Sequence, residues 1–87
     1  MITDDLMVEF YQTVQQYGEE LSAAFSSKDW EQVHKVSHNI KGCGAPFGHP
    51  RLSELGAMVC ERVDEGEQDS VGVVVGELLA EINGFPA

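Results

Sequence analysis

The sequence predicts an all-α protein, an antiparallel four-helix bundle in which the helices run up, down, up and down. Apolar residues recur at steps of three and four along four separate stretches of the chain, which is the spacing of an amphipathic helix. The segments between those stretches are short, and short connections join antiparallel neighbours in a bundle. The chain of 87 residues is long enough for one modest core, so we expect a single helical domain over residues 1–87.

The first helix is expected from about Asp4 to Phe25. Its apolar residues keep one helical phase straight through Gly18. A glycine inside a helix costs about 1 kcal/mol relative to alanine, so one long helix is preferred to the alternative, a break at Gly18 into two helices. Thr3, Asp4 and Asp5 suit the start, where backbone N–H groups lack partners. The expected core-facing residues are Leu6, Phe10, Val14, Tyr17, Leu21, Ala24 and Phe25.

The second helix is expected from Trp30 to Phe47, after a turn. Asp29, followed three residues later by Gln32, fits a capping box at its start. Pro46 removes one backbone donor near its end, and Gly48 is the expected terminator. The expected core-facing residues are Trp30, Val33, Ser37, Ile40, Gly44 and Phe47.

Pro50 suits the first turn of a third helix, which we expect to end at Gly66 and the polar residues 67–69. Ser70 is the expected cap of a fourth helix that runs to about Asn83. Residues 71–75 are rich in valine and in isolation would indicate a strand, but a lone strand has no partner in this chain. The expected core-facing residues are Leu52, Leu55, Val59 and Val63, then Val71, Val74 or Val75, Leu78 and Ile82.

The net charge of −10 argues against a nucleic-acid partner, because no basic face is available to neutralise phosphates. The charge is unevenly spread. Residues 30–51 hold Glu31 against Lys35, Lys41 and Arg51 and are the only positive segment, whereas both flanking segments are acidic. Chance placement of three cations is one interpretation. We favour the other, a local site for an anion on an otherwise acidic protein.

Neither a membrane span nor a secretory signal is indicated. No stretch reaches the 18 or so apolar residues of a spanning helix, and the first residues are acidic where a signal peptide is basic. The two cysteines, Cys43 and Cys60, do not make a disulfide framework. We therefore expect a cytoplasmic protein with reduced thiols.

Helical spacing singles out His38. It lies about 150° from the middle of the core-facing stripe of the second helix, so it is expected to project into solvent. Lys41 and Gly42 lie one turn later on the same side, and Lys35 lies three residues earlier. Gly42 and Ala45 leave no bulk in the way of an approaching partner. A neutral imidazole is nucleophilic near pH 7, and neighbouring cations suit attack on phosphorus and stabilisation of the charged product.

The run His38-Asn39-Ile40-Lys41-Gly42-Cys43-Gly44, followed by Phe47-Gly48 and Leu52, resembles the histidine-containing phosphotransfer (HPt) family. The family pattern is His, any residue, an aliphatic, Lys, Gly and two small residues, with a hydrophobic residue and Gly further on. Pro46 and His49 depart from it, which affects the partner-contact surface more than the chemistry.

The resemblance implies that His38 is the phosphoacceptor and that Lys41 stabilises the phosphate charge. Such domains accept the group from a receiver-domain aspartyl phosphate or a histidine kinase and pass it to a response regulator. They lack machinery for ATP, so the chain is expected to be a phosphocarrier and not an enzyme. We expect no cofactor of its own, magnesium only in the receiver partner, and a monomer. The expected partner contacts are His34, Lys35, Gly42, Ala45 and Gly48.

Two alternatives belong to other functional classes. His34 and His38 are four residues apart, which is also a metal-ligand spacing on a helix, and Cys43, His49 and Cys60 are near in sequence. Cys43, however, lies about 140° around the helix from His38, and Cys60 belongs to another helix. The other alternative is an adaptor that binds a receiver or kinase without accepting phosphate.

Overall fold

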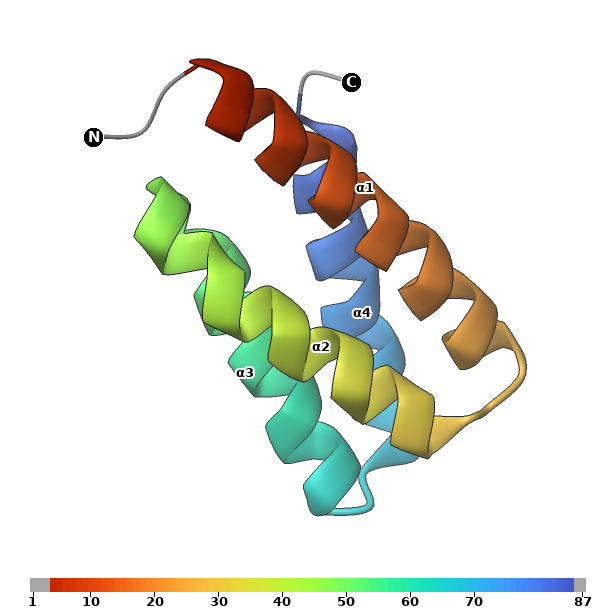
Figure 1. The fold of residues 1–87 in the computed structure, drawn as a ribbon. Coiled ribbons are helices and arrows are strands. Elements are labelled where there is room, and N and C mark those ends of the chain that lie inside the picture. Colours follow the sequence, from red (N-terminus) through yellow and green to blue (C-terminus); the bar gives the residue numbers. More distant parts are fainter. Residues whose placement is uncertain (1–3, 86–87) are drawn as a thin grey trace.

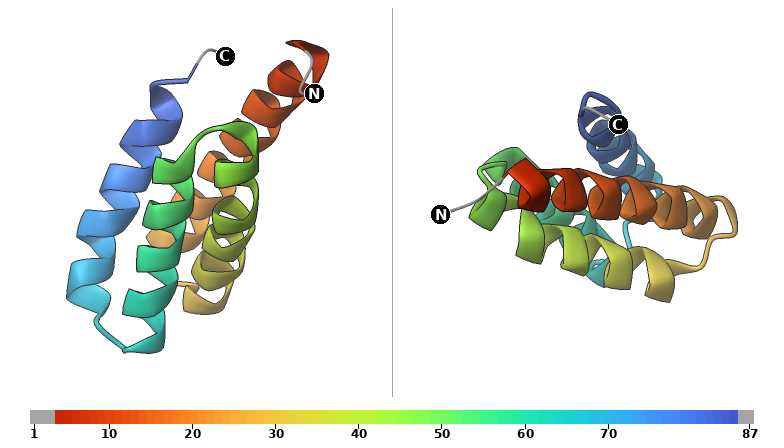
Figure 2. Two further views of the ribbon diagram at one scale, coloured as in Figure 1. Left: turned by 90° about the vertical axis from the view of Figure 1, so that its left-hand side faces the viewer. Right: turned by 45° about the horizontal axis from the view of Figure 1, so that its top comes forward.

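The computed structural model describes residues 4–85, which form four α-helices and one short 3₁₀ segment. The elements are α1 (Asp4–Ser26), α2 (Trp30–Gly44), η1 (Ala45–Phe47), α3 (Pro50–Asp64) and α4 (Gln68–Asn83) (Figure 1). No strand occurs among these residues, so the all-α prediction is confirmed, including a helix over the valine-rich residues 71–75. Each helix packs on the next along the chain, and α1 also packs on α4, so the four surround one core (Figure 2).

Helix α1 is continuous through Gly18, as the apolar phase predicts. Gly18 is buried, and a Cβ there would lie 3.3 Å from Cγ2 of Ile82, so its lack of a side chain lets α1 approach α4. The prediction that Leu6 faces the core is wrong, because this side chain is 43% exposed near the start of the helix. Thr3, proposed as part of the helix start, lies outside the described residues.

Helix α2 begins where the capping pattern predicts. Asp29 holds the N-cap position, and its carboxylate accepts a hydrogen bond of 3.3 Å from the backbone N–H of Gln32. This contact satisfies one of the donors that a helix start leaves without a partner.

The prediction of one helix from Trp30 to Phe47 is wrong, because α2 ends at Gly44 and the chain continues as η1. An α-helix would next bond the N–H of Ala45 to the carbonyl of Lys41. Instead, both groups form hydrogen bonds with the hydroxyl of Ser53 in α3, which accepts from Ala45 N–H at 2.8 Å and donates to the Lys41 carbonyl at 2.7 Å. A side chain inserted in this way interrupts the helical ladder.

The segment after α2 closes on Gly48, as predicted. Gly48 has φ 85°, in the left-handed region that glycine adopts without steric cost, and its N–H bonds to the Ala45 carbonyl. Pro50 then occupies the first turn of α3, also as predicted. The chain therefore turns between α2 and α3 within a few residues.

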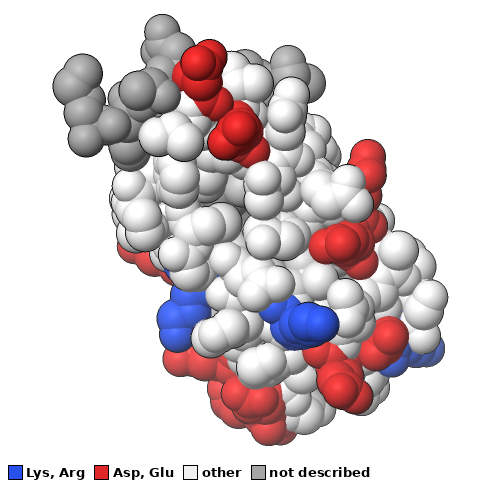
Figure 3. Space-filling view, in the orientation of Figure 1, with Lys and Arg blue, Asp and Glu red and all other residues white. Residues whose placement is uncertain are grey.

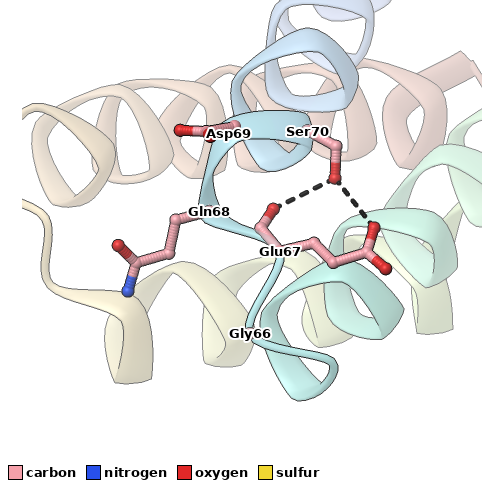
Figure 4. A pocket seen from close by; sticks show the side chains of 5 residues that line it. All are labelled: Gly66, Glu67, Gln68, Asp69 and Ser70. Carbon is pink, nitrogen blue, oxygen red and sulfur yellow. Dashed lines mark hydrogen bonds between the residues drawn. The ribbon is translucent and has the colours of Figure 1, made fainter.

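The start of α4 differs from the prediction. Glu67, not Ser70, holds the N-cap position, and the helix begins at Gln68. Ser70 lies in the first turn, where its hydroxyl donates to the Glu67 carbonyl at 3.0 Å and lies 3.2 Å from a Glu67 carboxylate oxygen (Figure 4). Ser70 thus takes part in the first turn of α4, but Glu67 precedes the first helical residue, without a hydrogen bond from its own side chain to the helix start.

The core forms from the apolar stripes that the helical spacing predicts, and both Val74 and Val75 are buried. Val36 is also buried although the predicted stripe omits it, whereas Val63 is only half-buried. The buried apolar residues are Phe10, Val14, Leu21, Ala24, Val33, Val36, Ile40, Leu52, Leu55, Val59, Cys60, Val71, Val74, Val75, Leu78 and Ile82. None of the described helices combines the length and apolarity that a membrane crossing requires.

Candidate functional site

His38 lies in the middle of α2 with its side chain exposed, as predicted from helical spacing. Its neighbours Ser37 and Ile40 are buried, which fixes the orientation of this turn of the helix. Lys41 and Gly42, one turn later, are exposed as well. A Cβ added to Gly42 would meet nothing within 4 Å, so the backbone there is open to an approaching molecule.

The turn of α2 that carries His38 rests directly on α3. A Cβ on Gly56 would lie 2.7 Å from the carbonyl oxygen of Ser37 and 2.9 Å from the backbone nitrogen of Lys41. Both distances are too short for any larger residue without a shift of backbone. Gly56 therefore sets how closely α3 supports the helix behind His38.

Gly56 was not identified from the sequence as part of this region. Its sequence signal is that a glycine stands beside Leu55, in the interior of an amphipathic helix where it costs about 1 kcal/mol relative to alanine. Such a glycine usually has a packing reason. What the pattern does not reveal is which helix comes close.

A second close contact lies at the end of α2. A Cβ on Gly44 would lie 2.8 Å from both the His49 carbonyl oxygen and Cβ of Leu52, and 2.9 Å from the backbone nitrogen of Ser53. Together with the Ser53 hydroxyl at Lys41, these contacts hold the last two turns of α2 against α3. The helix that carries His38 is thus held against α3 by these contacts on its buried side.

The positive segment predicted from the sequence divides into two parts. Arg51 lies 3.5 Å from a Glu54 carboxylate and 3.8 Å from that of Glu77. Lys35 and Lys41 are exposed, and within residues 4–85 neither forms an ion pair. Figure 3, in the orientation of Figure 1, shows separated cationic groups in the lower half of this face, with acidic groups at its top and bottom and along its edges. Two lysines are therefore available to an anion beside His38.

His34 is half-buried one turn before His38. Its Nε2 atom lies 3.3 Å from a carboxylate oxygen of Asp64, in the last turn of α3. The rings of His34 and His38 are nearly parallel, at 9°, with centroids 6.5 Å apart. His34 therefore lies beside the exposed imidazole, as expected, and Asp64 is a neighbour that the sequence analysis did not identify.

Of the residues considered for a metal site, His34 and His38 lie side by side, but Cys43 and His49 have other surroundings. Among residues 4–85, no group of three or more His, Cys, Asp or Glu side chains is placed to hold a metal ion. Cys43 is half-buried, with its sulfur 3.5 Å from the Ile40 carbonyl, and the buried Cys60 lies 3.5 Å from the His34 carbonyl. Burial raises the pKa of both thiols above the ordinary value, and the Asp64 charge adds to this at Cys60.

His49 lies in an aromatic cluster beyond the end of α2. Its Nε2 atom is 3.2 Å from the Tyr11 hydroxyl, and its ring stacks on Phe10 at 5.4 Å and lies 4.6 Å from Phe85. Phe47 also stacks on Phe10, with ring centroids 4.6 Å apart. The cluster anchors η1 to α1. Ala45 and Gly48, expected to contact a partner, are exposed next to it.

The comparison with protein families gives one match. The family model described as the Hpt domain matches residues 5–85, nearly the whole chain. Neither the curated proteins nor the solved structures include a match to this sequence.

Proposed function

Because the chain belongs to the Hpt domain family, we propose that it is a phosphorelay intermediate that carries a phosphoryl group on His38. Hpt domains are phosphocarrier modules of phosphorelays and not catalytic enzymes. The observation that carries the assignment to His38 is its exposed position in mid-helix, with Lys41 and the open backbone of Gly42 one turn away.

The chemistry asks little of this chain beyond positioning. The lone pair of a neutral ring nitrogen of His38 attacks phosphorus, the N–P bond forms, and the bond from phosphorus to the partner's aspartyl oxygen breaks. The carboxylate leaves with the electron pair. Catalysis of phosphoryl transfer is mostly placement and charge stabilisation, and the ammonium of Lys41 is available for the second task because no described carboxylate engages it.

The proposed partners are receiver domains of response regulators, a sensor histidine kinase, or both. The contact surface we propose consists of His34, Lys35, Gly42, Ala45 and Gly48, which lie on α2 and the segment after it. All but the half-buried His34 are exposed. In this proposal the protein acts as a cytoplasmic monomer without its own cofactor, and the magnesium ion belongs to the receiver. Nucleic acid and membranes have no part in it.

The proposal includes one domain with antiparallel, up-down-up-down helices. Contacts between α1 and α4 support the opposite direction of these two helices, because Gly18 faces Ile82 whereas Phe25 faces Gly72. Along α2 and α3 the partners also reverse, from His34 with Cys60 and Asp64 to Lys41 with Ser53. Nuclear Overhauser contacts between the residues of each pair test this arrangement.

The decisive test is label transfer from a ³²P-phosphorylated receiver domain. The wild type should acquire an acid-labile, base-stable label, and His38→Gln should acquire none. His49→Gln is the matched control, because it also removes one imidazole but one that is engaged with Tyr11. It should keep the label, with folding of both variants checked by circular dichroism. Label retained in His38→Gln would move the phosphoacceptor elsewhere, and receiver binding without any label would identify an adaptor.

A further inference from the structure

We propose that His34, held by the carboxylate of Asp64, takes up a proton when His38 is phosphorylated and so provides a second positive charge, beside Lys41, for the phosphorylated state. This inference rests on the proposed function, since it concerns the same phosphoacceptor. It makes His34 a positioning and charge-balancing residue and Asp64 the residue that orients it.

The geometry places His34 between a negative group and the acceptor. Its Nε2 atom lies 3.3 Å from the Asp64 carboxylate, within reach of a charge-assisted contact. Its ring lies parallel to that of His38, with centroids 6.5 Å apart. At that separation the two rings share no hydrogen bond, so His34 acts on His38 through its charge and not as a proton-transfer partner.

The charged and titratable groups around His34 come from α2 and α3. On α2 they are Glu31, Lys35 and His38. On α3 they are Asp64 and Cys60, whose thiol stays neutral because burial raises its pKa. No hydrogen bond or ion pair joins His34 to α1 within the described chain. Two carboxylates, those of Glu31 and Asp64, thus border the hollow in which the imidazole lies.

Phosphorylation adds a strong negative charge to this setting. A phosphoryl group carries about −1.5 to −2 at neutral pH. An ordinary imidazole titrates near neutral pH, so a small energetic preference changes its protonation. The covalent step itself needs no extra proton: the N–P bond to His38 forms, the donor's bond to phosphorus breaks, and His34 then binds one proton from solvent.

Coulomb's law gives the size of the effect. The centroids of the His34 and His38 rings are 6.5 Å apart, and a distance of roughly that size is taken for the charge on His34 and a phosphoryl group on His38. In water, a unit positive charge at that distance favours the phosphorylated state by about five- to ten-fold. The phosphotransfer equilibrium with a receiver should therefore shift towards phosphorylated His38 as the pH falls, by about this factor more in the wild type than in His34→Gln. Titration of the receiver affects both proteins alike and cancels in the ratio.

The experiment measures that equilibrium between pH 6 and pH 8 with one labelled receiver domain. The wild type and His34→Gln should agree near pH 8 and differ by about five-fold or more near pH 6. Near pH 6, the phosphotransfer equilibrium of Asp64→Asn should lie between those of the wild type and His34→Gln. Glu61→Gln is the matched control, because Glu61 is an exposed carboxylate on the same helix that forms no hydrogen bond or ion pair with His34 within residues 4–85, and it should behave as the wild type.

A spectroscopic measurement distinguishes charge from structure. His38 is phosphorylated with phosphoramidate, which transfers its phosphoryl group and releases ammonia, and the ring carbon shifts of His34 are recorded at pH 7. They should move towards those of imidazolium on phosphorylation, less so in Asp64→Asn.

A His34→Gln defect that is the same at every pH, or His34 shifts that stay unchanged, would overturn this inference and leave the proposed function intact. Absence of any phosphohistidine signal from both donors would instead overturn the proposed function, and this inference with it.

Discussion

Gly42 and Gly76 allow the role of an open backbone beside His38 to be separated from its effect on stability. Both glycines are exposed within helices, and a Cβ added at either would meet nothing within 4 Å. Alanine at either position should therefore be accommodated without strain. Only Gly42 lies one turn from His38, whereas Gly76 lies on α4.

The expected change in stability follows from the helix propensities. Gly→Ala in a helix contributes about 0.5–1 kcal/mol, partly by restricting the unfolded chain. For a domain of this size, that raises the melting temperature by about 2–8 °C. We expect an increase in both Gly42→Ala and Gly76→Ala, smaller in Gly42→Ala because Gly42 lies in the last turn of α2.

The expected change in function is confined to Gly42→Ala. A methyl group on the surface where the receiver must approach costs about 1–2 kcal/mol if the fit is close, which slows transfer about five- to thirty-fold. The assay follows label transfer from a phosphorylated receiver at limiting concentrations, beside thermal unfolding of the same preparations. Transfer by Gly42→Ala at the rate of Gly76→Ala would refute the reasoning that the receiver approaches this backbone. A melting temperature of Gly42→Ala below that of the wild type would contradict the finding that a Cβ at Gly42 meets no other atom.

Three further outcomes are expected. Gly56→Ala should lower the free energy of unfolding by about 1–2 kcal/mol in urea titrations, because the methyl group would meet the backbone of Ser37 and Lys41 at 2.7 and 2.9 Å; unchanged stability would contradict the tight α2–α3 contact. Lys41→Ala should keep its circular dichroism spectrum yet slow transfer or shorten the lifetime of phosphohistidine, by about five-fold, and unaltered kinetics would leave Lys41 as a solvated surface residue. Burial raises the pKa of the Cys60 thiol in the folded protein, so its contribution to the free energy of unfolding is complete below the ordinary pKa of 9.0 and is lost as the pH rises through the folded value. In urea titrations above about pH 9, Cys60→Ala should therefore lose less of its free energy of unfolding than the wild type. Equal losses in the two proteins would contradict this.

Helical spacing predicted the number of helices, most of their limits and the exposure of His38, because these depend on which residues share a face. Helical spacing could not predict the contacts between helices. At the early end of α2, the hydroxyl of Ser53 in α3 takes the place of a helical hydrogen bond, and the pairing of His34 with Asp64 joins residues 30 positions apart in the sequence. Spacing within one helix says nothing about such partners.

Other differences lie at helix starts. Ser70 is the residue type that usually caps a helix, but Glu67 precedes the first helical residue of α4, directly after Gly66 with φ 72°. Leu6 keeps the helical phase, but it lies so near the beginning of α1 that it is left 43% exposed. The roles of Lys35, Gly42, Ala45 and Gly48 in partner binding stay predictions.

The contacts of Gly44, Gly56 and Ser53 have a consequence for how the proposed receiver partner would engage this protein. Because α2 touches α3 backbone to backbone, it cannot slide or rotate under an incoming partner without collision. In the proposed relay, the His38 ring is therefore presented from a helix packed tightly against α3, with its own side-chain torsions free to adjust. In a relay with several receivers, each one must conform to this fixed presentation, and differences in transfer rate between receivers should then originate in their own loops.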